Sequence, residues 1–165
     1  MGLNTLTHPF EPVYDENSRI LIVGSFPSVI SRKQQFYYAN PRNRFYRVLA
    51  ELLNKDVPHD PVEMRHFLLD SHIAVFDALA SCSIRGSSDA SIRDAVPNDF
   101  SSIFDTAPIR AVYANGRTAH TAYEKYTGPA VYLPSTSPAN AAYDMERLKE
   151  AWSVILPQLL DNACT

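Results

Sequence analysis

The apolar run Ile20-Leu21-Ile22-Val23, followed at once by Gly24-Ser25-Phe26-Pro27-Ser28, decides the fold class of this chain. Four consecutive bulky apolar residues predict a strand that is buried on both faces, which is typical of a parallel sheet. A glycine at the end of that strand lets the backbone turn sharply or approach a ligand closely. Loops at the carboxyl ends of parallel strands are where open α/β sheets build their binding sites.

A second stretch with the same layout begins more than a hundred residues further along the chain. The apolar run Ala130-Val131-Tyr132 is followed by the loop Leu133-Pro134-Ser135-Thr136-Ser137-Pro138-Ala139-Asn140. Because this loop contains no acidic residue and no histidine, it cannot supply a general base. Its small polar side chains suit contacts to a phosphodiester, or they belong to a rigid surface loop without a ligand. The candidate phosphate-binding residues are Ser135, Thr136, Ser137 and Asn140.

Strands and helices alternate along the rest of the chain. The expected strands are Arg19–Val23, His72–Phe76, Ile109–Ala114 and Val131–Leu133. The expected helices are Asn43–Leu53, Asp60–Asp70, Arg117–Tyr126 and Asp144–Leu160, and the turn before the third of them is Asn115-Gly116. This alternation predicts an α/β fold, a three-layer α/β/α sandwich around a central four-stranded parallel sheet. Residues 1–18 are interpreted as a lead-in, and residues 77–104 as mostly loop with short helical pieces.

Two of the expected helices carry specific signals. Asp60 is expected to cap its helix, with Pro61 at the first helical position and Glu63 reaching back. The last helix has apolar residues three and four positions apart, which form a stripe that faces the core. The members of this stripe are Met145, Leu148, Trp152, Ile155 and Leu159.

The bulk composition limits the class of protein. With 165 residues, 45% of them hydrophobic, the chain is long enough for one globular domain, 1–165, with its own core. No apolar run approaches the roughly 20 residues of a membrane span, and no signal peptide opens the chain. Cys82 and Cys164 are too few for a cysteine cluster, and the five histidines show no metal-ligand spacing. We therefore expect a cytoplasmic monomer with no metal and no cofactor.

Charge is distributed unevenly along the sequence. The net charge of −3 differs from the strongly basic balance of many nucleic-acid-binding domains. Local clustering matters more than the sum, and one stretch of the chain carries basic charges only. Its members are Arg32, Lys33, Arg42, Arg44 and Arg47. This stretch is the candidate surface for an anionic partner.

An aromatic triplet, Phe36-Tyr37-Tyr38, lies next to a polar turn, Asn40-Pro41-Arg42-Asn43. Neighbouring side chains leave the backbone in different directions, so at least one of the three rings should face a cavity or solvent. Stacking on a nucleic-acid base is one use for such a ring. Asn43 either caps the helix that follows or offers its amide, which donates and accepts hydrogen bonds, to a ligand or water.

Taken together, these segments resemble the uracil-DNA glycosylase superfamily. Gly24-Ser25-Phe26-Pro27-Ser28 stands where that family has its first motif, and Leu133-Pro134-Ser135 resembles its second motif. Between them, Tyr38-Ala39-Asn40-Pro41-Arg42-Asn43-Arg44-Phe45-Tyr46 looks like the segment that follows the first motif in the mismatch-specific branch. The full pattern is most similar to the hypoxanthine-DNA (deoxyinosine) glycosylase branch. The resemblance covers nearly the whole chain and implies the fold of that superfamily.

The motifs depart from the usual superfamily pattern in a way that bears on chemistry. Phe26 stands where the first motif usually has a carboxylate or an amide, and Leu133 where the second usually has His or Asn. Both common catalytic side chains are therefore absent, as is typical of the hypoxanthine branch. In that branch an asparagine of the downstream segment is implied in catalysis, and Asn43 matches it.

The resemblance also implies roles for the other candidates. The implied base-binding residues are Gly24, Ser25, Phe26 and Tyr38. Arg42 would join the loop residues named above in binding DNA phosphates. The base-reading residue at the end of the next strand stays open between Asp77, Ser81 and Asp89.

The implied activity is that of a monofunctional DNA-deoxyinosine glycosylase. Such an enzyme binds DNA that contains a deaminated base, flips the base out and hydrolyses its N-glycosidic bond, which leaves an abasic site. Three alternatives stay open: a uracil or mismatch DNA glycosylase, a non-catalytic DNA-binding module with the same fold, and a small-metabolite α/β domain. Phe26 argues against the first, and the aromatic triplet argues against the last.

Overall fold

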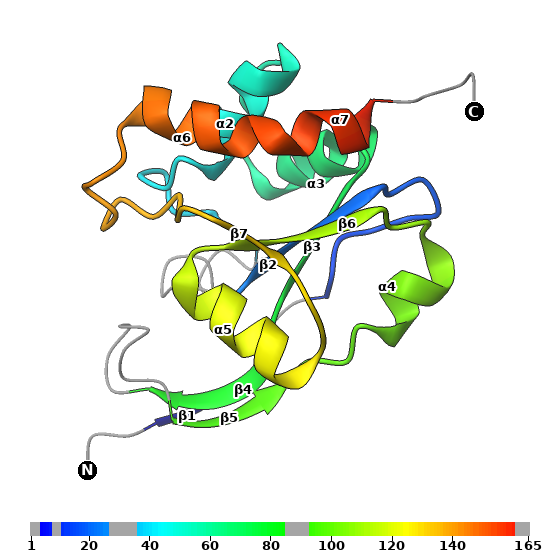
Figure 1. The fold of residues 1–165 in the computed structure, drawn as a ribbon, viewed down its shortest axis with the longest axis vertical. Coiled ribbons are helices and arrows are strands. Elements are labelled where there is room, and N and C mark those ends of the chain that lie inside the picture. Colours follow the sequence, from blue (N-terminus) through cyan, green and yellow to red (C-terminus); the bar gives the residue numbers. More distant parts are fainter. Residues whose placement is uncertain (1–3, 8–10, 27–35, 85–92, 161–165) are drawn as a thin grey trace.

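The structure, a computed structural model, describes residues 4–7, 11–26, 36–84 and 93–160 of the chain. At its centre lies a four-stranded parallel sheet in the order β3-β2-β6-β7 (Figure 1). Its strands are β2 (Ile20–Gly24), β3 (Ile73–Asp77), β6 (Ala111–Asn115) and β7 (Val131–Leu133). The prediction of this sheet is confirmed, and each strand lies within two residues of its expected bounds.

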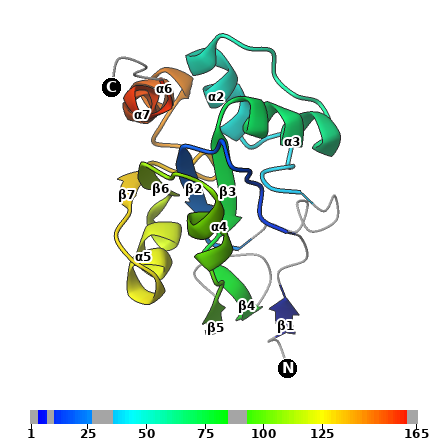
Figure 2. The ribbon, with the colours of Figure 1, turned by 90° about the vertical axis from the view of Figure 1, so that its right-hand side faces the viewer.

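Helices cover both faces of the parallel sheet, as expected for a three-layer sandwich (Figures 1 and 2). Above the sheet in Figure 1 lie α2 (Phe45–Leu53), α3 (Pro61–Asp70), α6 (Met145–Trp152) and α7 (Leu156–Leu159). Below it lie α4 (Ser101–Thr106) and α5 (Arg117–Tyr126). In the described part of the chain, no helix has the length and apolar character that crossing a membrane requires.

Helix α3 begins as its sequence predicts. The Asp60 carboxylate accepts a hydrogen bond from the backbone N–H of Glu63 at 2.8 Å, and Pro61 is the first helical residue. The Glu63 carboxylate in turn accepts a hydrogen bond from the backbone N–H of His59 at 2.9 Å. These contacts satisfy two backbone donors at the start of the helix, where no helical partner exists for them.

The last helix is interrupted, whereas the sequence predicts one continuous helix from Asp144 to Leu160. A 3-10 turn, η2 (Ser153–Ile155), separates α6 from α7. Pro157 explains the break, because it has no N–H to donate to the carbonyl of Ser153. The apolar stripe is buried as predicted, apart from Met145, which is only partly buried. Its buried members are Leu148, Trp152, Ile155 and Leu159.

A second, antiparallel sheet lies below the parallel one, and the sequence analysis does not predict it (Figure 1). Its strands, in the order β1-β4-β5, are β1 (Asn4–Thr7), β4 (Leu79–Ile84) and β5 (Arg93–Pro97). The interpretation of residues 1–18 as a lead-in and of residues 77–104 as mostly loop is wrong for these strands. Small and polar residues dominate β4, so it lacks the apolar alternation that marks a strand. Pairing with β1 on one side and β5 on the other makes it a strand.

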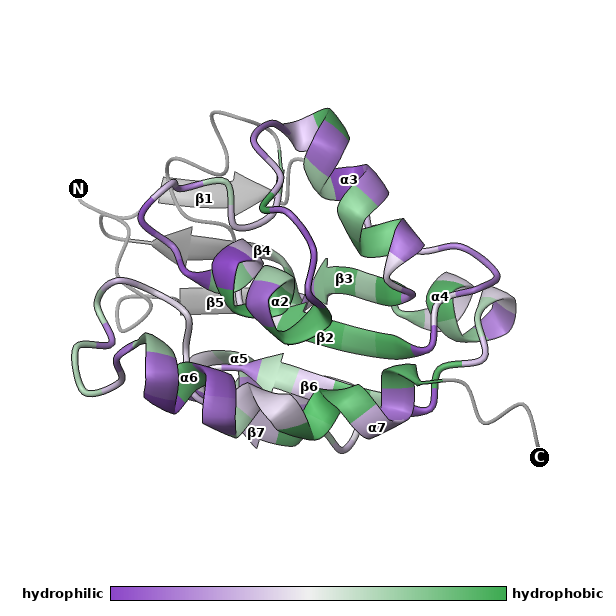
Figure 3. Ribbon diagram, turned by 90° about the horizontal axis from the view of Figure 1, so that it is seen from above, coloured by the Kyte–Doolittle hydropathy of each residue, from purple (hydrophilic) through white to green (hydrophobic). Residues whose placement is uncertain are grey.

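Strands β2 and β3 form the apolar centre of the molecule. Both appear as continuous hydrophobic ribbons in Figure 3, whereas polar and apolar residues alternate along α6. Every residue of the two strands is buried. Trp152 of α6 is also completely buried, and its indole N–H donates a hydrogen bond to the carbonyl of Pro134 at 2.9 Å. This hydrogen bond anchors the loop after β7 to the hydrophobic core.

Candidate active site

All four strands of the parallel sheet end at the same edge, and the predicted site segments gather there. The register pairs Gly24 at the end of β2 with Asp77 of β3, and Asn115 at the end of β6 with Leu133 of β7. The segment around Asn43 meets the loop after β7, although the two contacting residues are 93 positions apart in sequence. The polar turn around Asn43 and the loop after β7 therefore lie side by side.

Asn43 is held in place through its side-chain oxygen. Its Oδ1 accepts a hydrogen bond from the hydroxyl of Thr136 at 2.7 Å and another from the backbone N–H of Phe45 at 2.9 Å. The second bond is a local turn contact just before α2; the N-cap position itself is Arg44, so Asn43 is not the cap of this helix. Among the residues that the structure describes, none accepts a hydrogen bond from Asn43 Nδ2, and the side chain is half-buried. The amide nitrogen is therefore the part of Asn43 that a ligand can use.

Thr136, the partner of Asn43, is completely buried. Its hydroxyl accepts a hydrogen bond from Nδ2 of Asn115 at 3.0 Å, and its backbone N–H donates to Oδ1 of Asn115 at 3.0 Å. A hydroxyl with no exposed surface and two protein partners cannot also contact a DNA phosphate, so we withdraw Thr136 from the phosphate-binding candidates. Asn115 is not predictable as a site residue, because the turn signal of Asn115-Gly116 accounts for an asparagine there by itself.

Arg44 turns inward and clamps the loop after β7. Its guanidinium donates hydrogen bonds to the carbonyl of Tyr143, to that of Ser137 at 2.9 Å and to that of Asn140 at 3.1 Å. Its backbone N–H donates to the carbonyl of Thr136 at 3.0 Å. Arg44 is therefore a structural cation and not a DNA contact.

Two other members of the basic stretch face solvent. Arg42, in the turn before α2, and Arg47, in the first turn of α2, are both exposed. Arg32 and Lys33 lie outside the described residues. The candidate cations for a DNA backbone are thus reduced from five to four, of which two are located.

The loop from Pro134 to Asn140 is braced by its own polar groups. The hydroxyl of Ser135 accepts a hydrogen bond from the Ser137 N–H, and that of Ser137 accepts one from the Ala139 N–H, each at 3.1 Å. Nδ2 of Asn140 donates to the carbonyl of Ser135 at 3.0 Å. Each serine oxygen acts here as an acceptor, so each hydroxyl keeps its proton for an outside acceptor such as a phosphate oxygen.

Of the aromatic triplet, only Tyr38 escapes burial. Phe36 and Tyr37 are buried, whereas Tyr38 is half-buried, which confirms the expectation that not all three rings enter the core. The ring of Tyr38 stacks on Phe45 with centroids 4.0 Å apart and planes 27° from parallel. Its φ of 55° lies in the left-handed region, which directs the side chain away from the course of an extended backbone. Phe45 covers one face of the ring, so that face is closed to a base.

Gly24 packs closely against the side chains of Tyr38 and Asp77. A Cβ atom at this position would lie 2.2 Å from Oδ1 of Asp77 and 2.8 Å from the hydroxyl oxygen of Tyr38. Both distances are far below van der Waals contact, so only glycine fits unless these side chains move. Asp77, at 3% exposure, is the one base-reading candidate found in this corner. Ser81 lies in β4, and Asp89 lies outside the described residues.

Two buried phenols line the back of the same corner. Burial raises the pKa of Tyr37 far above its ordinary value, and the nearby Asp77 carboxylate raises it further. Burial also raises the pKa of Tyr46, with a smaller contribution from Tyr38. Both phenols therefore stay protonated and act as donors, Tyr46 to the carbonyl of Tyr37 at 2.8 Å and Tyr37 to the carbonyl of Glu11 at 3.0 Å. They fix the aromatic segment and cannot serve as bases at neutral pH.

The turn after β2 is held by its backbone carbonyl groups and by the buried side chain of Phe26. Phe26 is buried, at 8% exposure, and belongs to the hydrophobic core. The carbonyls of Gly24 and Ser25 accept hydrogen bonds from Ala78 N–H at 2.7 Å and Leu79 N–H at 3.1 Å. The turn is therefore anchored to the chain that leaves β3. Pro27 and Ser28 of the first motif lie outside the described residues.

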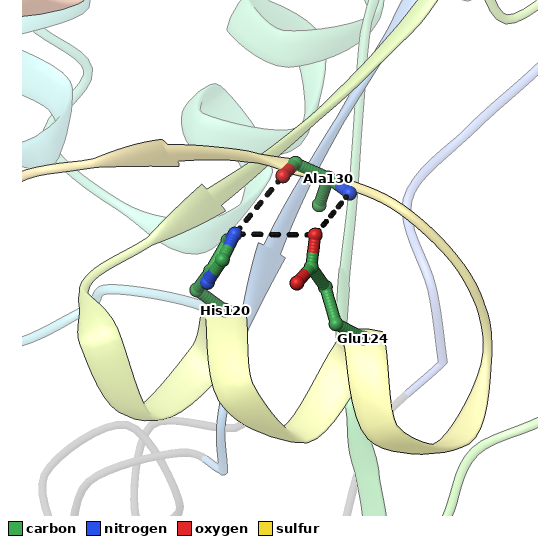
Figure 4. A network of polar contacts seen from close by, with 3 residues as sticks. All are labelled: His120, Glu124 and Ala130. Atoms are coloured by element: carbon green, nitrogen blue, oxygen red, sulfur yellow. Dashed lines mark hydrogen bonds and ion pairs between the residues drawn. The ribbon is translucent and has the colours of Figure 1, made fainter.

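The histidine on α5 has a structural role. His120 Nε2 lies 3.3 Å from a carboxylate oxygen of Glu124 and 3.0 Å from the carbonyl of Ala130 (Figure 4). The same Glu124 oxygen accepts a hydrogen bond from the backbone N–H of Ala130 at 3.3 Å. These contacts tie α5 to the segment that leads into β7.

A cavity of about 650 Å³ opens between the N-terminal segment, α3 and α4, and no candidate site residue lines it. Four carboxylates and one guanidinium contribute to its walls: Glu11, Asp15, Glu16, Asp99 and Arg65. This acidic lining repels phosphates, so the cavity is not suited to DNA. Within the ranges that the structure covers, no three metal-ligating side chains come together.

Known proteins resemble this chain in sequence and in fold. The profile of the Uracil DNA glycosylase superfamily matches residues 11–158. A protein of Methanosarcina acetivorans named Hypoxanthine DNA glycosylase is 35% identical over 152 residues, which are 88% of this chain and 95% of that protein. A protein of the same name from Methanosarcina barkeri is 34% identical over 110 residues, 66% of this chain and 70% of its own length. The solution NMR structure of a provisionally named uracil DNA glycosylase from Methanosarcina acetivorans has a TM-score of 0.76 at 33% identity, and the match covers 91% of this chain and 96% of that one.

Proposed function

This chain belongs to the uracil-DNA glycosylase superfamily, and we propose on that premise that it is a DNA repair glycosylase that removes hypoxanthine from deoxyinosine. The observation that carries the proposal is the placement of Asn43. Its amide is held against the loop after β7 at the carboxyl edge of the sheet, and neither that loop nor the segment Gly24–Ser28 contains a carboxylate or an imidazole. Asn43 is therefore the residue to which we assign catalysis.

The flipped base would bind in the corner formed by Gly24, Tyr38 and Asp77. A deaminated base pairs poorly, so less free energy is needed to flip it out of the duplex. We assign stacking on the flipped base to the ring of Tyr38. Asp77 suits base reading, because a carboxylate accepts a hydrogen bond from the ring N–H that hypoxanthine has and adenine lacks. The Ser25-Phe26 turn would present its backbone to the base carbonyl.

The DNA backbone would contact the loop after β7 and the start of α2. The hydroxyl protons of Ser135 and Ser137 are suited to phosphate oxygens, and the exposed Arg42 adds positive charge. The Asn140 amide already donates one hydrogen to the loop, and its second hydrogen is left for a phosphate. Because Arg44 and Trp152 hold this loop from inside, its hydroxyls are ordered before DNA arrives.

The reaction is hydrolysis of the bond between the base and C1′ of the sugar. As this bond breaks, its electron pair leaves with the base, and the sugar develops oxocarbenium character. Neighbouring DNA phosphates stabilise the positive sugar, and hydrogen-bond donors of the site stabilise the negative base. A water molecule then bonds to C1′ and releases its proton, which leaves an abasic site. Because no strong base is present, we expect slow chemistry that depends on a base that departs easily.

A strand-cleavage assay tests this function directly. Duplex oligonucleotides that contain one inosine, one uracil or one xanthine are incubated with the protein, and abasic sites are then cleaved with alkali. We expect cleavage at inosine to exceed cleavage at uracil. Cleavage at uracil alone would favour the uracil or mismatch glycosylase, and binding without cleavage would favour the non-catalytic module.

The stacking role of Tyr38 predicts different effects for two substitutions. We expect Tyr38→Ala to lower the single-turnover rate of inosine excision about tenfold, since base stacking contributes roughly 1–3 kcal/mol. Tyr38→Phe keeps the ring and should stay within about twofold of the wild-type rate. Because Tyr38 also stacks on Phe45, thermal unfolding of both variants is the control for the fold. Equal losses in the two variants would assign the effect to the phenol hydroxyl instead.

The salt dependence of DNA binding should be shallow. Arg44 is turned inward, so Arg32, Lys33, Arg42 and Arg47 are left to neutralise phosphates, and each contributes roughly −0.9 to the slope of log affinity against log salt. We expect a slope between about −2 and −4, measured with the Asn43→Ala variant and an inosine duplex. Adding Arg42→Gln should make the slope shallower by about 0.9. A slope near zero would favour a small-metabolite protein, and one steeper than about −6 would require a further basic surface.

A further inference from the structure

A directed chain of hydrogen bonds connects β6, the loop after β7 and the start of α2. Its direction is fixed at both ends by backbone N–H groups, which can only donate. At one end the N–H of Thr136 donates to Asn115, so Oδ1 of Asn115 faces that N–H and its Nδ2 faces the Thr136 hydroxyl. At the other end the N–H of Phe45 donates to Asn43, so Oδ1 of Asn43 must face inward.

The direction of the remaining hydroxyl proton follows. The Thr136 oxygen already accepts from Nδ2 of Asn115 at 3.0 Å, and its own proton points to Oδ1 of Asn43 at 2.7 Å. Water does not compete for this proton, because Thr136 is completely buried. The chain therefore runs from Asn115 through Thr136 to Asn43 and cannot be reversed without leaving a buried N–H unpaired, which costs about 1–3 kcal/mol.

These hydrogen bonds determine which atoms of the Asn43 amide can bind a ligand. An amide oxygen has two lone pairs, and both are occupied, by Thr136 and by Phe45. The oxygen therefore cannot accept a hydrogen bond from an attacking water. Donors on the oxygen also draw electron density from the amide nitrogen, which makes the Nδ2 hydrogens stronger donors. What the site receives from Asn43 is a fixed N–H pair.

We propose that Asn43 acts as a hydrogen-bond donor to the departing base, and that Thr136 and Asn115 are positioning residues that hold it in this role; the inference rests on the glycosylase function proposed above. The bond from C1′ to the base breaks, and the electron pair spreads over the ring nitrogens and the carbonyl oxygen of the base. Each of these atoms is an acceptor for Nδ2. The amide stabilises the negative base without transferring a proton, and the water that adds to C1′ loses its proton to solvent.

The substitution Asn43→Asp separates a donor from a water-activating group. An aspartate oxygen still accepts from Thr136 and Phe45, so the local hydrogen bonds are kept, but the second oxygen replaces the donor with a negative charge. At pH 7.5 an aspartate with an ordinary pKa of about 3.9 is ionised. We expect Asn43→Asp to excise hypoxanthine at least about threefold more slowly than Asn43→Ala under single-turnover conditions. A rate for Asn43→Asp above that of Asn43→Ala would overturn the proposal.

The pair Thr136→Val and Thr136→Ser tests the positioning role. Valine keeps the shape of threonine and removes the hydroxyl, whereas serine keeps the hydroxyl. We expect Thr136→Val to lower the single-turnover rate about tenfold at unchanged affinity for the inosine duplex, and Thr136→Ser to stay within about threefold of wild type. A Thr136→Val protein that loses thermal stability but keeps the wild-type rate would overturn the positioning role.

The same measurements distinguish a failure of the glycosylase function from a failure of the donor role of Asn43. A folded wild-type protein that excises none of the deaminated bases would refute the proposed function, and this inference with it. An active wild type whose Asn43→Asp variant is faster than Asn43→Ala would refute the donor role alone. If Thr136→Val fails to fold, the Asn43→Asp comparison still decides, because it leaves both inward hydrogen bonds in place.

Discussion

We expect Asn43→Ala to lower the single-turnover rate of hypoxanthine excision at least about 100-fold, a loss of about 2.7 kcal/mol of transition-state stabilisation. No other side chain of the two motif loops can take over, since Phe26 is buried in the core and Leu133 is apolar and buried. The rate is measured with enzyme in excess over an inosine duplex, followed by alkaline cleavage. A rate within about threefold of wild type, only ~0.7 kcal/mol, would remove Asn43 from catalysis.

Asn40→Ala is the matched control for this variant. Oδ1 of Asn40 accepts a hydrogen bond from the backbone N–H of Arg42 at 2.9 Å, so it supports the same turn in the way that Asn43 supports α2. Removing it tests whether any loss of turn structure slows the reaction. We expect the Asn40→Ala rate to stay within about threefold of wild type. A large loss in both variants would mean that the turn, and not the Asn43 amide, is what the reaction needs.

Gly24→Ala is expected to have the second largest effect, a fall in excision rate of at least about 30-fold with a loss of roughly 1–3 kcal/mol of stability from overpacking. The new methyl group would lie 2.2 Å from a carboxylate oxygen of Asp77 and 2.8 Å from the Tyr38 hydroxyl oxygen. Asp77 is buried, so it has little room to move aside. Both groups assigned to the base would therefore shift at once. The excision rate and the midpoint of thermal unfolding measure the two effects.

Gly128→Ala is the control for Gly24→Ala. No atom lies within 4 Å of a Cβ built at Gly128, which precedes β7 and is remote from the Asn43 amide in the fold. The same chemical change there should alter stability by less than about 0.5 kcal/mol and leave the excision rate unchanged. A wild-type rate for Gly24→Ala itself would show that Asp77 and Tyr38 can yield without consequence, and would remove that corner from base binding.

The parallel sheet could be predicted because its strands carry strong local signals. The run from Ile20 to Val23 is apolar throughout, and the pattern of capping at Asp60 and turning at Gly116 is local in sequence. The antiparallel sheet could not be predicted in the same way. Strand β4 contains small and polar residues, and it is held as the central strand by pairing with β5 on one side and, on the other, with β1, more than seventy residues away in sequence.

The site followed from the sequence only in part. The carboxyl-edge loops and Tyr38 are predictable, because strand ends and aromatic clusters are visible in a single chain. The inward turn of Arg44 is not, since its partners are carbonyls of Ser137, Asn140 and Tyr143, and carbonyls carry no residue-specific signal. The role of Asn115 is likewise not predictable, because Asn-Gly is a common turn dipeptide and explains the asparagine by itself. Contacts of this kind appear only when distant segments are folded together.

The order in which the ribosome makes these segments has a consequence for the cell. Asn43 leaves the exit tunnel early, but its partner Thr136 follows 93 residues later, and the loop around Thr136 is braced by the indole of Trp152 later still. Domains generally fold as units once enough chain has emerged. A nascent chain that is stalled or degraded before Trp152 therefore lacks the brace behind the loop and the ordered amide. We therefore expect a chain that ends before Trp152 to remove bases poorly, so that incomplete translation products generate few abasic sites.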